Sequence, residues 1–176
     1  MKEIQLSKFG KNKGKYIALV DDEDFDMLNQ FNWSVAFSRN TFYAMRKQCS
    51  PERKTIRMHR FIFNINDPNI IIDHKNRNGL DCQRKNLRIC THSQNSKNKK
   101  ASGSSKYLGV TVYMNKIRRK ILIRAQINNG EKMVTLGYFN NEIEAAAAYN
   151  EAAIKYHGEF ANLNDLTPDP GTKKGL

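Results

Sequence analysis

The chain has 176 residues, of which 39% are hydrophobic, enough to build one medium domain or two small ones. Lys and Arg number 30 against 17 Asp and Glu, and this net charge of +13 favours a polyanionic partner such as nucleic acid or an anionic membrane surface. No apolar run is long enough to span a bilayer, and the start, MKEIQLSKFG, lacks the apolar centre of a secretory signal. We therefore expect a soluble cytoplasmic protein.

Residues 1–50 predict a small β-rich region. Strand-like pieces lie at 2–6, 15–20, 32–37 and 41–47, and Gly, Asn and Arg-Asn turn signals separate them. The acidic segment 21–31 predicts a short helix, with Phe25, Leu28 and Phe31 on one stripe and Asp21 or Asp22 as its cap. A solvated helix that balances charge is favoured over a metal site here.

Residues 51–100 hold most of the positive charge. They carry 12 Lys and Arg against four acidic residues, so we expect the surface that meets the polyanion in this segment. Within it, residues 70–73 read as a strand, Asn78-Gly79 as a tight turn, 87–91 as a second strand, and 92–100 as a helix capped by Thr91 or Ser93. The pattern predicts a small ββα unit.

Oxygen ligands and an imidazole fall close together in this ββα unit. Asp73 closes the first strand and Asn95 lies near the start of the helix. A carboxylate and an amide oxygen suit Mg²⁺ or Mn²⁺, and the adjacent His74 is placed to take a proton from water. Successive strand residues point to opposite faces, so the two can share a site only if the strand ends or twists there. We expect the many nearby cations to keep His74 neutral by repulsion.

The linked segments MHR at 58–60, DH at 73–74, NLR at 86–88 and THSQN at 91–95 resemble the HNH nuclease motif in the form found in phage and intron-encoded homing endonucleases. The resemblance implies that Asp73 and Asn95 ligate one divalent metal, Mg²⁺ or Mn²⁺, that His74 is the general base, and that Asn86 ties down the loop that orients the imidazole. From the positive charge of this segment we expect backbone contacts to DNA at Arg60, Arg77, Arg84, Lys97, Lys99 and Lys100.

Other readings of this segment stay open. His59, in an apolar stretch, is read as structural or as a phosphate contact in preference to a second catalytic group. Cys49, Cys82 and Cys90 are an odd set without CxxC spacing, so neither a disulfide framework nor a usual zinc site is indicated.

The small, flexible residues of ASGSS at 101–105 predict a linker to a second unit at 106–164. Strand-like runs lie at 106–114, 118–128 and 132–139, the last two joined around Asn129-Gly130. An alanine-rich helix follows and ends near Gly158. Its Ala-rich side, with Tyr149 and Tyr156, should pack on the sheet; Ile123, Ala125 and Ile127 should face inward. Residues 165–176 predict a disordered tail.

The segments YLGV, RAQI, LGYF, EAAAAYNEAA and HGEFANLN resemble the APETALA-two or ethylene-response-factor DNA-binding domain in the form appended to phage HNH nucleases. The resemblance implies that the open sheet face enters the major groove of DNA. The implied contacts are Thr111, Tyr113, Arg124, Gln126, Asn128, Met133 and Thr135. Apart from the resemblance, the cations Arg118 and Arg119 of the first hairpin are expected to contact phosphates. Met133 and Thr135 differ from the Arg or Trp usual in the family, so no target sequence carries over.

The sequence thus predicts an α+β chain with an N-terminal region at 1–50, an HNH nuclease module at 51–100, a linker, a DNA-binding domain at 106–164 and a tail. We expect a monomeric, homing-type endonuclease that hydrolyses double-stranded DNA with one divalent metal. A DNA-binding regulator without catalysis and a basic RNA-binding protein are the alternatives.

Overall fold

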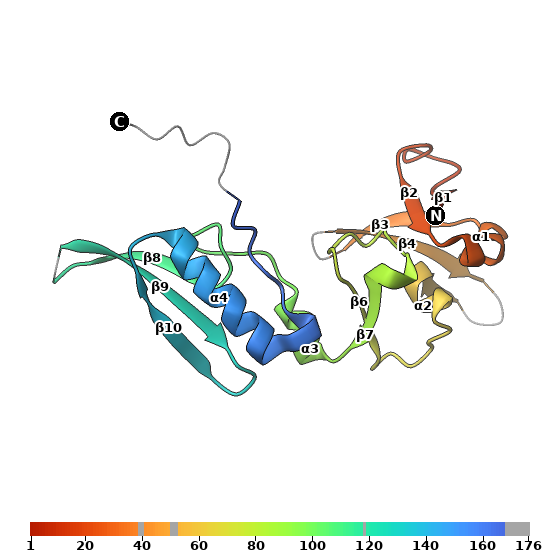
Figure 1. Ribbon diagram of the computed structural model, residues 1–176. Helices are drawn as coiled ribbons and strands as arrows, with labels where there is room; N and C mark the ends of the chain where they lie inside the picture. The colour runs from red at the N-terminus through yellow and green to blue at the C-terminus, as the bar shows by residue number, and fades with distance from the viewer. Residues whose placement is uncertain (39–40, 50–52, 118, 168–176) are drawn as a thin grey trace. The chain divides into compact units, whose positions relative to one another are not determined.

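The computed structural model describes residues 1–38, 41–49, 53–117 and 119–167 (Figure 1). It confirms the predicted α+β class, with small antiparallel sheets and short helices. The chain forms two compact units, Met1–His92 and Ser93–Leu176, and each is described by itself below. We call them the N-terminal unit and the C-terminal unit. In the described residues no helix has the length and apolar character needed to cross a membrane.

The N-terminal unit is built from three small sheets, and the described residues pair antiparallel within each of them. The first sheet pairs β1 with β2, the second has the order β3-β4-β5, and the third pairs β6 with β7. The elements are β1 (Lys2–Gln5), β2 (Ile17–Val20), α1 (Asp22–Asn29), β3 (Ser34–Ser38), β4 (Thr41–Gln48), β5 (Lys54–Arg57), α2 (Met58–Ile62), β6 (Ile71–His74), the 3-10 turn η1 (Arg84–Asn86) and β7 (Leu87–Cys90).

One apolar core joins residues 1–50 to the predicted nuclease segment. Its fully buried members include Leu6, Leu28 and Trp33 from the first part and Met58 and Cys82 from the second. Phe25 packs against this core beside Leu28, as the helical stripe predicts. Phe31 also packs against the core, but it lies beyond α1, which ends at Asn29, so its predicted place in the helix is wrong. The predicted cap is only partly confirmed, since Asp21 takes the cap position of α1 but makes no side-chain hydrogen bond to the helix.

The connection between β6 and β7 is a long loop, although Asn78-Gly79 predicted a tight turn. Gly79 does lie in a turn, with the Asp81 N–H donating to the Asn78 carbonyl over 3.1 Å. The loop then pairs with β2, where Leu19 N–H donates to the Leu80 carbonyl over 2.9 Å. A side chain at Gly79 would lie 2.4 Å from the Phe42 carbonyl oxygen. The glycine is therefore required by the close approach of the loop to β4.

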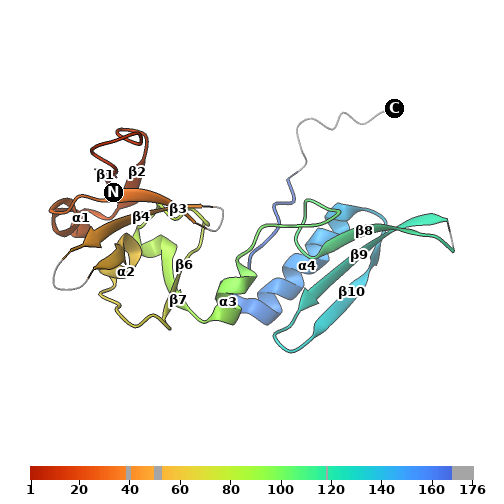
Figure 2. The same cartoon turned by 180° about the vertical axis from the view of Figure 1, so that it is seen from behind.

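The C-terminal unit is a three-stranded antiparallel sheet with one long helix across it. The sheet order is β10-β9-β8, and Figures 1 and 2 show α4 lying along one face. The elements are α3 (His92–Lys97), which starts at the last residue of the other unit, β8 (Val110–Asn115), β9 (Lys120–Asn128), β10 (Met133–Phe139), α4 (Glu142–His157) and the 3-10 turn η2 (Gly158–Phe160).

Small side chains let α4 lie close to the sheet. Ala145, Ala146 and Ala153 are fully buried, and Ala125 and Ile127 of β9 face them, as the alternation predicts. The prediction that Tyr156 belongs to this buried side is wrong, because 36% of its surface is exposed. The helix begins at the capping residue Asn141 and ends at Gly158, whose φ of 54° suits glycine.

Candidate active site

The β6–β7 hairpin carries the predicted carboxylate and imidazole. Asp73 pairs with Arg88 across the ladder and His74 pairs with Leu87, so the strand ends at His74, one residue later than predicted. Asp73 and His74 are 7% and 4% exposed. Successive strand residues point to opposite faces, and the two side chains accordingly contact different partners.

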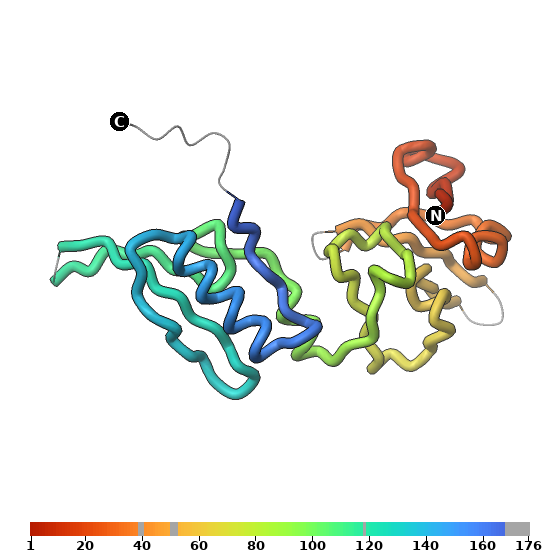
Figure 3. The backbone as a smooth tube through the Cα atoms, in the orientation of Figure 1, coloured from red at the N-terminus to blue at the C-terminus, as the bar shows by residue number. Residues whose placement is uncertain are grey.

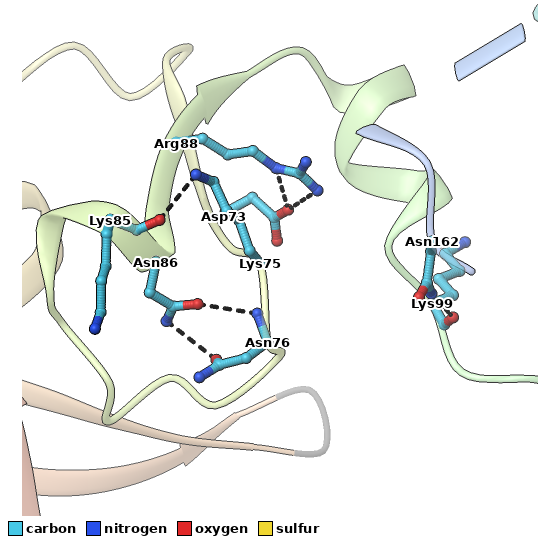
Figure 4. Close-up of polar contacts among 8 residues, drawn as sticks. All are labelled: Asp73, Lys75, Asn76, Lys85, Asn86, Arg88, Lys99 and Asn162. Carbon is cyan, nitrogen blue, oxygen red and sulfur yellow. Dashed lines mark hydrogen bonds and ion pairs between the residues drawn. The ribbon is translucent and has the colours of Figure 1, made fainter. Parts of the chain in front are cut away.

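Arg88 holds the carboxylate of Asp73. Its Nε and Nη2 donate to the same oxygen, Oδ2, over 3.1 and 2.9 Å (Figure 4). The two side chains are 11% and 8% exposed. A charged group this deeply buried needs a partner of opposite charge, and Arg88 supplies that partner to the Asp73 carboxylate. Sequence spacing alone did not predict this pair.

His74 lies in a cluster of rings. Its ring centroid is 4.9 Å from that of His59, edge to face, and 5.8 Å from that of Tyr43. Burial lowers the pKa of His74 to about 4, while Asp73 and Asp81 act in the opposite direction. The imidazole is therefore neutral at neutral pH, as predicted. The predicted cause is wrong, because burial and not repulsion by neighbouring cations lowers the pKa.

His59 belongs to the same ring cluster, although sequence spacing alone did not place it there. It comes from α2, is 4% exposed, and lies 5.8 Å from Tyr43 between ring centroids. Burial lowers the pKa of His59 to about 3, and His74, Arg57 and Arg60 lower it further by repulsion. His59 is thus a neutral ring packed against the candidate base.

Asn86 connects β7 to the loop that follows His74. Its Oδ1 accepts a hydrogen bond from the Asn76 N–H over 3.0 Å. Its Nδ2 donates to Asn76 Oδ1 over 3.0 Å (Figure 4). The same Nδ2 donates to the Asp81 carbonyl over 2.7 Å. The Asn86 carbonyl also accepts from the Lys75 N–H over 2.8 Å. Through these hydrogen bonds Asn86 fixes the start of the loop, at Lys75 and Asn76, and a later part of it, at Asp81.

Two predicted DNA contacts hold the protein itself together. Arg60 donates to the carbonyls of Ile70 and Asp67, and so anchors the segment before β6. Arg84 donates to both carboxylate oxygens of Asp24 on α1. These bonds give both arginines a structural role, and their contact with DNA stays a prediction. Arg77 is exposed, with a φ of 63°.

The other predicted groups of the nuclease segment lie in the C-terminal unit. Asn95 lies on α3, half-buried, and its carbonyl accepts from the Asn98 N–H over 3.2 Å. The helix ends at Lys97, before Lys99 and Lys100, although the sequence predicted a helix as far as residue 100. Lys99 is fixed through its carbonyl, which accepts from Asn162 Nδ2 (Figure 4). The shared metal site of Asp73 and Asn95 stays a prediction.

The donor set for a metal is small. Within the part of the chain that the structure describes, no group of three or more His, Cys, Asp or Glu side chains could hold an ion. Asp73 supplies a buried carboxylate and Asn95 an amide oxygen. Each is a hard oxygen donor of the kind that Mg²⁺ and Mn²⁺ accept.

The open face of the C-terminal sheet, β10-β9-β8, carries the predicted recognition residues in register. Thr111, Arg124 and Tyr138 form one row across the three strands, and Gln126 faces Thr135 in the next. The remaining predicted positions are Tyr113, 5.8 Å from the Arg124 guanidinium to its ring centroid, the exposed Asn128 and Met133, and the exposed Arg119 of the β8–β9 connection. Arg118 lies outside the described residues.

Tyr138 is the member of this face that the sequence analysis missed. It is 60% exposed, and its side chain forms a hydrogen bond with Tyr113 that raises the pKa of Tyr113. Two tyrosines and an arginine thus form one polar cluster on the outer face. The register signal for Tyr138 was present in the sequence, but the β-bulge between Thr135 and Gly137 shifts the alternation along β10.

The N-terminal unit thus has a hairpin with a buried carboxylate and a neutral histidine, and the C-terminal unit has a sheet whose outer face carries an arginine and two tyrosines. Comparisons with known proteins give two similarities. Residues 59–97 match the family model described as HNH endonuclease. The chain is 26% identical over 168 residues to an uncharacterized HNH endonuclease of Acanthamoeba polyphaga mimivirus, covering 93% of this chain and 82% of that protein.

A second similarity concerns a shorter stretch. The chain is 40% identical over 81 residues to APETALA2-like protein 2 of Oryza sativa, in both subspecies indica and japonica. The match covers 42% of this chain but only 18% of the rice proteins, so the chain spans under a fifth of their length. No solved structure matches the chain. Together the matches support a nuclease segment at 59–97 and a partial likeness to APETALA2-like proteins.

Proposed function

We propose that the chain is an endonuclease that hydrolyses a phosphodiester bond of double-stranded DNA. The observation that carries the proposal is the buried, neutral His74 beside Asp73, in a hairpin whose loop Asn86 fixes, inside the segment that matches the HNH endonuclease family. The net charge of +13 supports a polyanionic substrate.

His74 is the proposed general base. A neutral imidazole accepts a proton from water, a contribution of about 10²–10⁴-fold to such reactions. Asn86 is the proposed positioning residue, because its bonds to Asn76 and to the Asp81 carbonyl fix the loop that starts at His74. The water oxygen bonds to phosphorus while His74 takes its proton, and the bond between phosphorus and the 3′ oxygen breaks. The 3′ oxygen takes a proton from solvent, so the products are a 5′ phosphate and a 3′ hydroxyl.

Asp73 and Asn95 are the proposed ligands of one divalent cation, Mg²⁺ or Mn²⁺. When bound, the cation stabilises negative charge that develops on the phosphate and the leaving oxygen. Arg88 forms an ion pair with Asp73, so a cation has to compete with this guanidinium for the carboxylate. The affinity of the site for metal is therefore set partly by the strength of the Asp73–Arg88 pair.

The C-terminal sheet is the proposed reader of DNA sequence. Thr111, Arg124 and Gln126 face away from α4, and amide and guanidinium groups form specific bonds with base edges in the major groove. A reading module joined to a cutting module supports a site-directed, homing-type enzyme. We propose that it acts as a monomer inside a phage-infected or intron-bearing cell.

The test is nicking of supercoiled plasmid with Mg²⁺, with Mn²⁺ and with EDTA. We expect nicking with either metal, no nicking in EDTA, and loss of nicking with retained DNA binding in His74→Ala. Ile89→Ala, at a 54% exposed position of the same hairpin, is the matched control and should nick normally. Cutting by His74→Ala at the wild-type rate would exclude the proposed base.

The Asp73–Arg88 pair favours a second candidate, a DNA-binding protein without catalysis, because the ion pair leaves the carboxylate already neutralised. This candidate predicts binding to duplex DNA and no metal-dependent cutting. Cleavage mapping on a library of randomised duplexes separates the two functions. It also reveals the target and whether one strand or both are cut.

A further inference from the structure

A lysine-rich loop at residues 7–15, here called the lysine loop, connects β1 to β2. Its base is fixed: Leu6 N–H donates to the Tyr16 carbonyl over 3.0 Å, and Ser7 N–H donates to the Trp33 carbonyl over 2.8 Å. Leu6 and Trp33 are 0% and 1% exposed. Figure 3 shows the segment, in red, extending beyond the two strands that it joins. The loop is thus held by the core of the N-terminal unit.

The tip of the lysine loop is ordered by its own backbone. Lys13 N–H donates to the Gly10 carbonyl over 3.0 Å and Lys15 N–H donates to the Asn12 carbonyl over 3.2 Å. Gly10 and Gly14 have φ values of 78° and 72°, which glycine adopts without strain. Two successive turns therefore shape the tip, and all its lysines are exposed.

The charge of the lysine loop is uncompensated. Residues 4–20 include Lys8, Lys11, Lys13 and Lys15 and no acidic residue. In the described parts of the chain none of these four lysines forms an ion pair. Three acidic residues that follow in α1 are engaged elsewhere: Asp22 pairs with the N-terminal amine, and Glu23 and Asp24 pair with Arg84. Four like charges on one short loop repel one another unless an anion lies against them.

An aromatic side chain stands among these lysines. Phe9 is 80% exposed, and no ring contact of Phe9 occurs among the described residues. Water around a large apolar ring is unfavourable, so a partner that covers Phe9 gains free energy. A cationic loop with one exposed ring matches the combination by which proteins bind nucleic acids, phosphate contacts plus apolar contact with sugars or bases.

We propose that the lysine loop is a third DNA-contacting element, separate from the catalytic hairpin and from the C-terminal sheet. Its lysines contact phosphates and Phe9 packs against a sugar or a base step. The proposal rests on the proposed function for the choice of DNA as the polyanion. An anionic membrane is disfavoured by the geometry, because surface binding of that kind uses a wide apolar face and this loop presents a single ring.

The first experiment measures equilibrium binding of the full chain to a linear duplex of mixed sequence, in EDTA, over a range of salt concentrations. For K8Q/K11Q/K13Q/K15Q we expect weaker binding and a slope of log K against log salt smaller by about 2–4, since each phosphate contact contributes about 0.9. The matched control K8R/K11R/K13R/K15R keeps every charge and should keep the slope.

The second experiment isolates the ring. Phe9→Ala should weaken binding by about tenfold at every salt concentration and leave the slope unchanged, because no charge is removed. Phe9→Trp, which keeps an aromatic ring at this position, should bind DNA with about the wild-type affinity. This pattern separates the apolar contact from the phosphate contacts, and loss of affinity in both variants would contradict the role of the ring.

Three outcomes would overturn the proposal: a glutamine variant whose slope stays within about 0.5 of the wild-type slope, a larger effect on binding to structured RNA than to duplex DNA, or a larger effect on binding to phosphatidylserine vesicles. Failure of the nuclease proposal gives a different result. In that case plasmid nicking is absent or survives His74→Ala, while the binding slopes, measured without metal, still change as expected.

Discussion

Removal of Arg88 tests whether Asp73 is a buried carboxylate that needs a positive charge beside it, either from Arg88 or from a bound cation. In Arg88→Met the stem of the side chain is kept and the two hydrogen bonds to Asp73 Oδ2, of 3.1 and 2.9 Å, are lost. Breaking a buried ion pair by removing one partner costs about 3–5 kcal/mol. Because the side chains are still 11% and 8% exposed, we expect a loss near the lower end, about 3 kcal/mol.

Urea unfolding followed by tryptophan fluorescence measures this loss. Trp33 is the single tryptophan of the chain, is 1% exposed, and lies in the core of the N-terminal unit. Its emission therefore reports the unfolding of the unit that contains the pair. The double variant D73N/R88M, which removes the unpaired charge, should be more stable than R88M alone by about 1–2 kcal/mol.

Divalent cation extends the test to the proposed metal site. A ligand that binds only the folded state stabilises it by about 2.7 kcal/mol at one hundred times its Kd. Mg²⁺ or Mn²⁺ should stabilise R88M more than the wild type, because in R88M no guanidinium competes for Asp73. If R88M unfolds within about 0.5 kcal/mol of the wild type in EDTA, or if neither metal stabilises it, the reasoning about this carboxylate is wrong.

Three further predictions concern the packing around the site and the second unit. Burial lowers the pKa values of His59 and His74 from 6.5 to about 3 and about 4, so the unfolded chain takes up protons below about pH 6.5 that the folded unit excludes. The free energy of unfolding should therefore be highest above that pH and should decrease towards pH 4, with a slope approaching about 2.7 kcal/mol per pH unit for the two histidines. His59→Phe should reduce this slope, and an unchanged slope would contradict the conclusion that His59 and His74 are both neutral in the folded unit. Gly79→Ala places a Cβ 2.4 Å from the Phe42 carbonyl oxygen and should destabilise the N-terminal unit by about 2–3 kcal/mol in the same urea assay. Asn141→Ala loses the cap of α4, a 2.8 Å bond to a backbone N–H, and should cost about 1 kcal/mol, measured by loss of the helical circular dichroism signal; Asn141→Asp, which keeps the acceptor, should cost less.

Local patterns were sufficient for elements that obey a clear period. The stripe of Phe25, Leu28 and Phe31 predicted α1, and alternation predicted that Ala125 and Ile127 face the helix. In both cases the buried side of the element is determined by residues a few positions apart. The observed bounds of α1, Asp22–Asn29, lie inside the predicted segment 21–31.

Elements too short to show a period were missed. β5, Lys54–Arg57, and α2, Met58–Ile62, were not predicted. Five residues make little more than one helical turn, and such an apolar run fits a strand as well as a helix. The missed helix had a consequence for the site, because α2 carries His59 to the ring of His74.

The partners of the candidate site could not be derived from spacing. Asp73 meets Arg88 only because β6 and β7 pair in one particular register, and Tyr43 reaches both histidines from a different sheet. The sequence motif identified which residue types are present, while long-range packing decides what each one touches. The pKa of His74 shows the difference, since its cause is burial by these partners and not the nearby basic residues in the sequence.

Residues 1–50 are part of the structure that forms the site. Leu19 of β2 pairs with both sides of the loop turn, through the Leu80 carbonyl and the Cys82 N–H, over 2.9 and 2.8 Å. Tyr43 of β4 packs on His74, the candidate base. β4 also lies so close to Gly79 that no larger residue fits at that position. The burial that keeps the imidazole neutral therefore depends on the N-terminal strands. The chemistry proposed for the hairpin requires this larger core, which explains how a loop as polar as 75–86 is held in one conformation.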